Sequence, residues 1–200
     1  MRFAPTSFRP AFGRVLSVVV VVIAAAGLVS FAAVGDWLGL VRYGWVLAML
    51  GVAALAVFWF PRLDVAEHEV TVRNVFSTVH VPWPAIERVD TKWALALHTA
   101  QGTVTAWASP APNRYASAAS NPANARLSRD QQGFAPRPGD LPETESGAAA
   151  YVIRQHWEDL RADGLLGAGA EPGSVRRDIH WGTIAVLGAL LLASALGILL

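Results

Sequence analysis

The order of apolar and polar positions divides this chain into long uncharged runs and shorter polar segments. Three windows contain no Asp, Glu, Lys or Arg: residues 15–34, 43–60 and 179–200, which are 20, 18 and 22 residues long. A hydrocarbon core of about 30 Å needs roughly 20 apolar residues of helix. Each window is therefore predicted to be a transmembrane helix. The first two, joined by residues 35–42, are predicted to form a helical hairpin over residues 15–60.

A different pattern follows over residues 61–109. Apolar and polar residues alternate with a period of two over residues 69–73, 78–81, 94–98 and 103–105. That period is typical of half-buried strands. Pro82 and Pro84 mark a break between strands, because neither can donate to a ladder. Gln101-Gly102 marks a short hairpin loop. The pattern predicts four to five strands in an antiparallel sheet with one covered face.

Residues 110–147 differ in composition from both neighbours. From Ser109 to Gly147, 24 of 39 residues are Pro, Gly, Ser, Ala or Asn. Such a segment buries too little surface to offset the entropy of ordering it. We interpret it as a flexible linker or insertion, and the alternative is a docking site for a partner.

Helical spacing returns at residues 148–164. Ser146 is a candidate N-cap and Gly164 a candidate stop signal. We expect the apolar face of this amphipathic helix to cover the open side of the sheet. The alternative is a helix lying on the membrane surface. Five residues form that face: Ala149, Val152, Ile153, Trp157 and Leu160.

Charges beside the windows predict the topology of the spans. Arg9 and Arg14 precede the first span, and Arg176 and Arg177 precede the third. Because basic residues are enriched on the cytoplasmic side, the tail 1–14 and residues 61–178 are predicted to be cytoplasmic. The C-terminus is predicted to lie outside, and the chain to be a three-span protein of the plasma membrane. A signal peptide is the alternative for the first span, but its apolar run exceeds the 7–15 residues of an h-region.

Composition agrees with this division. The chain is 54% hydrophobic and 16% charged, against roughly 45–50% and 25% in soluble domains. The 31 charged residues (16 basic, 15 acidic) all lie among the 140 residues outside the three windows. A net charge of +1 gives no indication of a nucleic-acid partner. The chain has no cysteine, which excludes thiol catalysis and thiolate metal sites.

The search for catalytic chemistry is largely negative. The chain has no G-x-S-x-G, P-loop or G-x-G-x-x-G motif, and no window contains an ionisable Asp, Glu, Lys or Arg. His80 and His98 lie on predicted strands, but a metal site needs three or four ligands. We therefore expect no catalytic, cofactor-binding or metal-binding residues, no cofactor and no enzyme activity. The alternative is an accessory subunit of a membrane enzyme or transport complex.

Two sets of residues are candidates for contacts instead. Four tryptophans are possible core or interaction anchors: Trp83, Trp93, Trp107 and Trp157. Small residues recur every four positions in the last window and form a possible helix-packing face: Ala185, Ala189, Ala193 and Gly197.

Two stretches, residues 64–74 and 79–89, resemble the bacterial PH-like domain membrane proteins, and in particular the family named after low molecular weight protein antigen 6. That family has a strand pair followed by a Pro-Trp-x-x-Ile element, which stands here as Pro82-Trp83-Pro84-Ala85-Ile86. Gln101-Gly102 is similar to a later turn of the same domains. The resemblance implies a PH fold of seven strands and a C-terminal helix. The predicted fold class is thus membrane α+β: a transmembrane hairpin, a partial PH-like sheet with a covering helix, and a C-terminal transmembrane helix.

The resemblance does not by itself imply phosphoinositide binding. Residues 61–114 carry five basic and five acidic groups, and the first hairpin offers Arg73 alone. A headgroup site needs a cluster of Lys and Arg, so the sequence has no phosphoinositide signature. We therefore expect a non-enzymatic membrane protein whose partners are the lipid bilayer and either another membrane protein or a second copy of the chain. Its cytoplasmic module would act in protein interaction or scaffolding.

Overall fold

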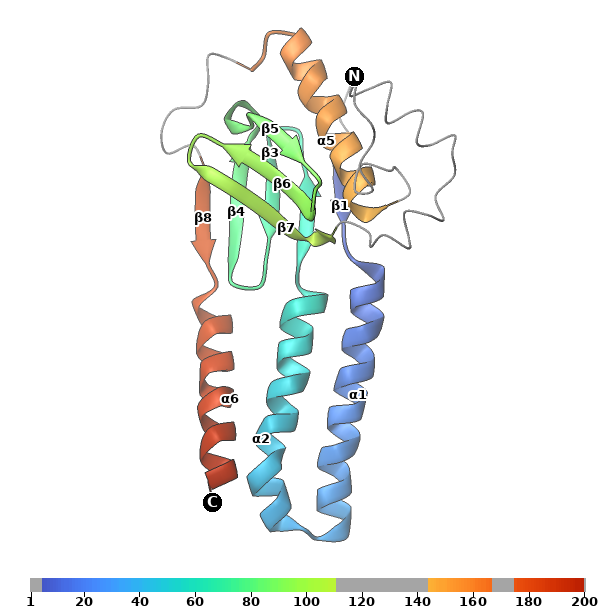
Figure 1. The fold of residues 1–200 in the computed structure, drawn as a ribbon, viewed down its shortest axis with the longest axis vertical. Coiled ribbons are helices and arrows are strands. Elements are labelled where there is room, and N and C mark those ends of the chain that lie inside the picture. Colours follow the sequence, from blue (N-terminus) through green and yellow to red (C-terminus); the bar gives the residue numbers. More distant parts are fainter. Residues whose placement is uncertain (1–4, 111–143, 167–174, 200) are drawn as a thin grey trace. The chain divides into compact units, whose positions relative to one another are not determined.

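The computed structural model describes residues 5–110, 144–166 and 175–199 (Figure 1). Contacts within the chain divide it into two units. The sheet unit comprises residues 1–9, 62–74 and 78–178, and the helix unit comprises residues 10–61, 75–77 and 179–200. The insertion predicted at residues 110–147 lies almost entirely outside the described residues.

The helix unit contains three helices that are long and apolar enough to cross a membrane: Ala11–Val34, Trp37–Trp59 and Trp181–Leu199. Helix α1 spans Ala11–Val34, and α6 spans Trp181–Leu199. Helix α2 spans Trp37–Ala54 and continues as the π-helical segment η1, Leu55–Trp59.

The connection between the first two helices is shorter than the charge pattern suggests. Helix α2 begins at Trp37, so Arg42 lies inside the helix rather than in a loop over residues 35–42. Gly35 adopts a left-handed φ of 74°. Asp36 then caps α2, its carboxylate accepting a hydrogen bond from the Gly39 amide at 2.8 Å. The second uncharged window begins only after Arg42, because it is defined by the absence of charged residues. Helix α2 begins earlier, directly after its N-cap Asp36.

Small residues set the contacts within the helix unit. A Cβ added at Gly197 of α6 would lie 2.9 Å from the carbonyl oxygen of Arg42 on α2. Gly197 is buried at this contact and Ala193 is partly buried, whereas Ala185 and Ala189 are exposed. A four-residue step advances about 40° beyond one full helical turn. The predicted small residues therefore turn progressively away from α2 toward the N-terminal end of α6, from Gly197 to Ala185.

The sheet unit has two sheets. The first has the order β1-β2-β3-β4-β8 and the second the order β5-β6-β7. Antiparallel registers are defined for β1–β2, β2–β3, β3–β4, β5–β6 and β6–β7. The strands of the first sheet are Thr6–Phe8, Arg62–Val65, Glu69–Arg73, Ser77–Pro82 and Arg176–Ile179. Those of the second are Arg88–Asp90, Ala94–Thr99 and Gly102–Pro110.

The four alternating segments predicted from sequence correspond to β3, β4, β6 and β7. The estimate of four to five strands for residues 61–109 is too low, since six strands, β2–β7, occur there, and β1 and β8 lie outside that segment. Strands β1, β2, β5 and β8 have only three or four residues each, too few to show a period. Strands β1–β7 match the seven strands that the resemblance implies. They form two separate sheets rather than one closed sheet, and β1 precedes α1 in the chain.

Helix α5, Glu145–Ala162, contacts β5, β6 and β7. Its Ala149, Ala150 and Ile153 are fully buried in the same core as Leu95 and Leu97 of β6. The prediction that this helix covers a sheet is therefore confirmed.

The predicted N-cap of α5 is wrong by two residues. The Thr144 hydroxyl accepts the Gly147 amide at 3.0 Å, and Ser146 lies buried in the first turn. Gly164, with φ of 68°, follows the helix as predicted.

Candidate functional site

The outer face of the first sheet is polar because its strands alternate. Leu63, Val65, Val70 and Val72 are buried on the inner face. Their neighbours on β2, β3 and β4 are partly exposed on the other face: Arg62, Asp64, Glu69, Thr71, Arg73 and His80.

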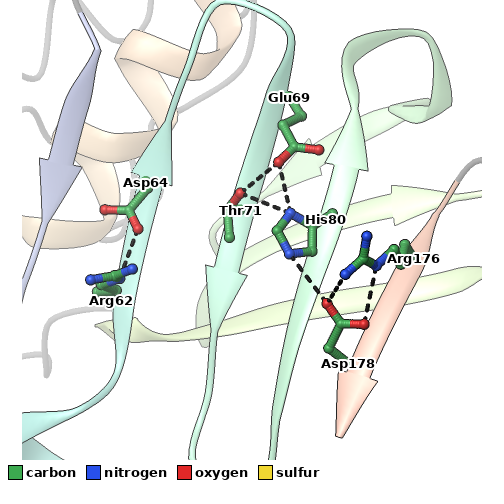
Figure 2. Close-up of polar contacts among 7 residues, drawn as sticks. All are labelled: Arg62, Asp64, Glu69, Thr71, His80, Arg176 and Asp178. Atoms are coloured by element: carbon green, nitrogen blue, oxygen red, sulfur yellow. Dashed lines mark hydrogen bonds and ion pairs between the residues drawn. The ribbon is translucent and has the colours of Figure 1, made fainter.

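His80 lies at the centre of a side-chain network on this face (Figure 2). Its Nδ1 atom is 2.7 Å from Glu69 Oε1 and 3.3 Å from the Thr71 hydroxyl, which lies directly across the β3–β4 register. Its Nε2 atom faces Asp178 of β8 at 3.6 Å. Arg176 donates two hydrogen bonds to Asp178, at 3.1 and 2.8 Å.

The network shifts the pKa values of two of its members, Glu69 and Arg176. Burial raises the pKa of Glu69, but hydrogen bonds from His80 and Thr71 and the charges of His80 and Arg176 outweigh it, so the pKa lies below its ordinary 4.5. The hydrogen bond to Asp178 and its charge raise the pKa of Arg176. Both groups therefore keep their charges at neutral pH.

This arrangement attaches the last strand to the sheet. None of the four side chains of β8 is buried. Pairing with β4 and the polar network are therefore the contacts that hold β8 at the sheet edge. Among the described residues, no group of three or more His, Cys, Asp or Glu could hold a metal ion.

A second polar contact joins the β3–β4 turn to β7. The Asn74 side chain donates to the Thr105 carbonyl at 2.8 Å, and its oxygen accepts the Trp107 amide at 3.0 Å. The Asn74 side chain thus bonds the backbone of two residues of β7 that are two positions apart, Thr105 and Trp107, as the backbone of a neighbouring strand would.

The four candidate tryptophans divide between core and surface. Trp83 is 2% exposed, and its indole N–H donates to the Ala66 carbonyl at 3.1 Å. Trp157 packs against the core. Trp93 is 81% exposed and Trp107 50% exposed. Trp93 directly precedes β6, and Trp107 lies on β7 between Thr105, which pairs with Ala96, and Pro110, which pairs with Ala94.

The two strand histidines do not form one site. His80 belongs to the first sheet, whereas His98 belongs to the second, where it contacts Arg88 and Thr103 at 3.2 and 3.0 Å. Sequence reasoning missed the network around His80, because Asp178 is almost a hundred residues away. The only local signal was the alternation that put Glu69 and Thr71 on one face of a strand.

Comparison with known proteins supports the PH-like assignment. Residues 60–150 match the family model described as "Bacterial PH domain". No curated protein and no solved structure matches the chain. The match covers β2–β7 and the start of α5, the elements that form the common core. Residues 60–150 of this chain therefore form a PH-like domain of the bacterial type.

Proposed function

We propose that this chain is a non-enzymatic protein of the plasma membrane whose PH-like domain binds another protein. PH domains are protein-interaction or lipid-binding modules and are generally not catalytic. The family assignment therefore supports an interaction module, and the surface of the domain supports a protein as the ligand.

The exposure of Trp93 and Trp107 is the observation that carries this proposal. Tryptophan has a large apolar surface, and it is enriched among the residues that dominate protein interfaces. Trp83, in the same domain, is buried as expected for a core residue. Both exposed indoles belong to the β6–β7 hairpin, Trp93 directly before β6 and Trp107 on β7, and we propose that one partner contacts both.

Charge also favours a protein over a phosphorylated inositol headgroup. The tip of the β3–β4 hairpin reads Asn74-Val75-Phe76-Ser77-Thr78 and carries no charge. A polyphosphorylated headgroup needs several cations in one place. Trp93 has one neighbouring cation, Lys92, whose ammonium lies 5.6 Å from the indole centroid.

Anchoring follows from the three apolar helices. We propose that they cross the plasma membrane and hold the sheet unit on the cytoplasmic side, so that the module recruits or scaffolds a membrane-associated partner. Arg9, Arg14, Arg176 and Arg177 support that orientation by the positive-inside rule.

The test compares three forms of the full-length chain purified from membranes in mild detergent: wild type, W93S/W107S and Y151S. Tyr151 is an exposed aromatic residue on α5, at 41% exposure, and serves as the matched control. We expect wild type and Y151S to migrate on native gels as one larger complex, and W93S/W107S to lose the partner. If all three forms run as the isolated chain with no enriched protein, the proposal is wrong.

A further inference from the structure

The turn between β3 and β4 belongs to the helix unit rather than to the sheet unit. Residues 75–77 group with the three apolar helices by their contacts. The backbone N–H of His180 donates to the Phe76 carbonyl at 2.9 Å. The His180 side chain also bonds the turn, since its Nδ1 lies 3.2 Å from the Val75 carbonyl oxygen. His180 directly precedes α6, so these bonds attach the turn to the N-terminal end of that helix.

The two large apolar residues of this turn have different surroundings. Val75 is buried, whereas Phe76 is 48% exposed. The sequence from Asn74 to Thr78 carries no charge. An apolar ring gains free energy when it leaves water, either in a bilayer or against a partner. The position of the turn along the helices favours the bilayer.

Two exposed tryptophans lie at nearly the same level along the helices. Trp181 begins α6, and Trp59 ends η1. Helices α2 and α6 run in opposite directions (Figure 1), and Gly197 of α6 contacts the Arg42 carbonyl of α2. Sixteen residues separate Trp181 from Gly197, and sixteen separate Arg42 from Phe58, next to Trp59. Each stretch rises about 24 Å. Trp181 is therefore close to the level of Trp59.

This level has the composition of a membrane interface. Tryptophan is enriched where a bilayer meets water, and arginine near a helix end extends toward the same region. The Arg14 guanidinium lies 5.6 Å from the centroid of the Trp59 ring. If these helices cross a bilayer, as proposed above, Trp59 and Trp181 lie at one interface. The Phe76 backbone is bonded to the residue before Trp181, so Phe76 lies at that interface too.

We propose that the β3–β4 turn is a membrane anchor whose Phe76 side chain inserts at the boundary between the headgroups and the acyl chains of the bilayer. The turn adds a lipid contact from outside the three helices, and the bonds from His180 hold it at the required level. The inference rests on the part of the proposed function in which the helices cross the bilayer, but not on the identity of any protein partner.

The test places one fluorescent probe beside Phe76, because the chain has no cysteine of its own. S77C carries an environment-sensitive fluorophore in the full-length protein, reconstituted in phosphatidylcholine vesicles. Quenching is measured with lipids whose nitroxide lies near the headgroup end or near the methyl end of the acyl chain, and with aqueous iodide. L191C, at an exposed position near the middle of α6, reports separately whether the helix is inserted. The S77C probe is then compared in chains that also carry F76S or F76L.

We expect the shallow nitroxide to quench the S77C probe more strongly than the deep one, and L191C to show the reverse order. F76S should lose most of the lipid quenching at S77C and gain quenching by iodide. F76L should stay close to wild type, because leucine also leaves water favourably.

Equal lipid quenching of S77C with Phe76 and with F76S would overturn the proposal. Lipid that quenches L191C but leaves S77C unquenched would also overturn it, whether water or a protein surface then surrounds Phe76. If L191C is not quenched either, the helices do not cross the bilayer, and both the anchoring proposed above and this inference are wrong.

Discussion

Asn74 shows how much one side chain contributes to the arrangement of the sheet unit. In the sequence it is a turn residue between two alternating segments, a position that asparagine commonly occupies. In the structure its amide satisfies a carbonyl and an amide group of β7, two residues apart. It therefore joins the β3–β4 hairpin of the first sheet to the edge of the second.

Replacing Asn74 tests that role directly. N74A removes both hydrogen bonds and leaves two backbone groups of β7 without this partner, so we expect a loss of about 1–3 kcal/mol in the free energy of unfolding. N74D keeps the acceptor for the Trp107 amide but loses the donor to Thr105, and should fall between N74A and wild type. Denaturant unfolding of the purified full-length protein measures both. Equal stability of all three forms would contradict the assignment.

At the scale of elements, β8 depends on polar contacts more than on burial. Its side chains contribute nothing to the core, and Asp178 joins it to His80, which is also bonded to Glu69. A strand held in this way should be sensitive to the ionisation of Glu69, whose carboxylate is bonded to His80. Helix α5 could be predicted from the sequence because its eighteen residues contain several helical periods. Strand β8 could not, because its four residues are too few to show a period.

Acid should weaken this attachment. The folded pKa of Glu69 is below 4.5, so its ionised form contributes stability above that pH, and the contribution is lost as pH falls through the folded pKa. We expect the thermal midpoint of wild type to fall more steeply below pH 4.5 than that of E69Q. E67Q, at an exposed turn position, should follow wild type. Parallel curves for wild type and E69Q would show that Glu69 makes no such contribution.

At the scale of the whole molecule, the positions of the charged residues on the strands describe the surface of the sheet unit better than the net charge does. The net charge of +1 does not show how basic and acidic residues are distributed over the sheet unit. The strand register places Arg62 and Arg73 directly opposite each other at one end of β2 and β3, whereas Glu69 begins β3 at the other end. The registers could not be read from the sequence, because neither β1 nor β2 was recognised as a strand.

Reporter fusions test the predicted topology. Insertions at Gly35–Asp36, within residues 111–143 and after Leu200 should report outside, inside and outside, because the basic residues flank the sheet unit and the N-terminus. The first insertion is placed at the short connection between α1 and α2, since α2 has already begun at Trp37. A reporter within residues 111–143 that is found outside would reverse the orientation and place the PH-like domain outside the cytoplasm.

The sequence by itself determined the elements whose pattern is long or repeated: three apolar helices, the alternating strands β3, β4, β6 and β7, and the amphipathic face of α5. Each carries its own period or length, which needs no knowledge of distant residues. Only the tertiary structure decided which tryptophans are buried, that the N-terminal strand β1 pairs with β2, and that Glu69, His80 and Asp178 meet. These features depend on pairing between segments far apart in the chain, and short strands have no local period that could indicate it.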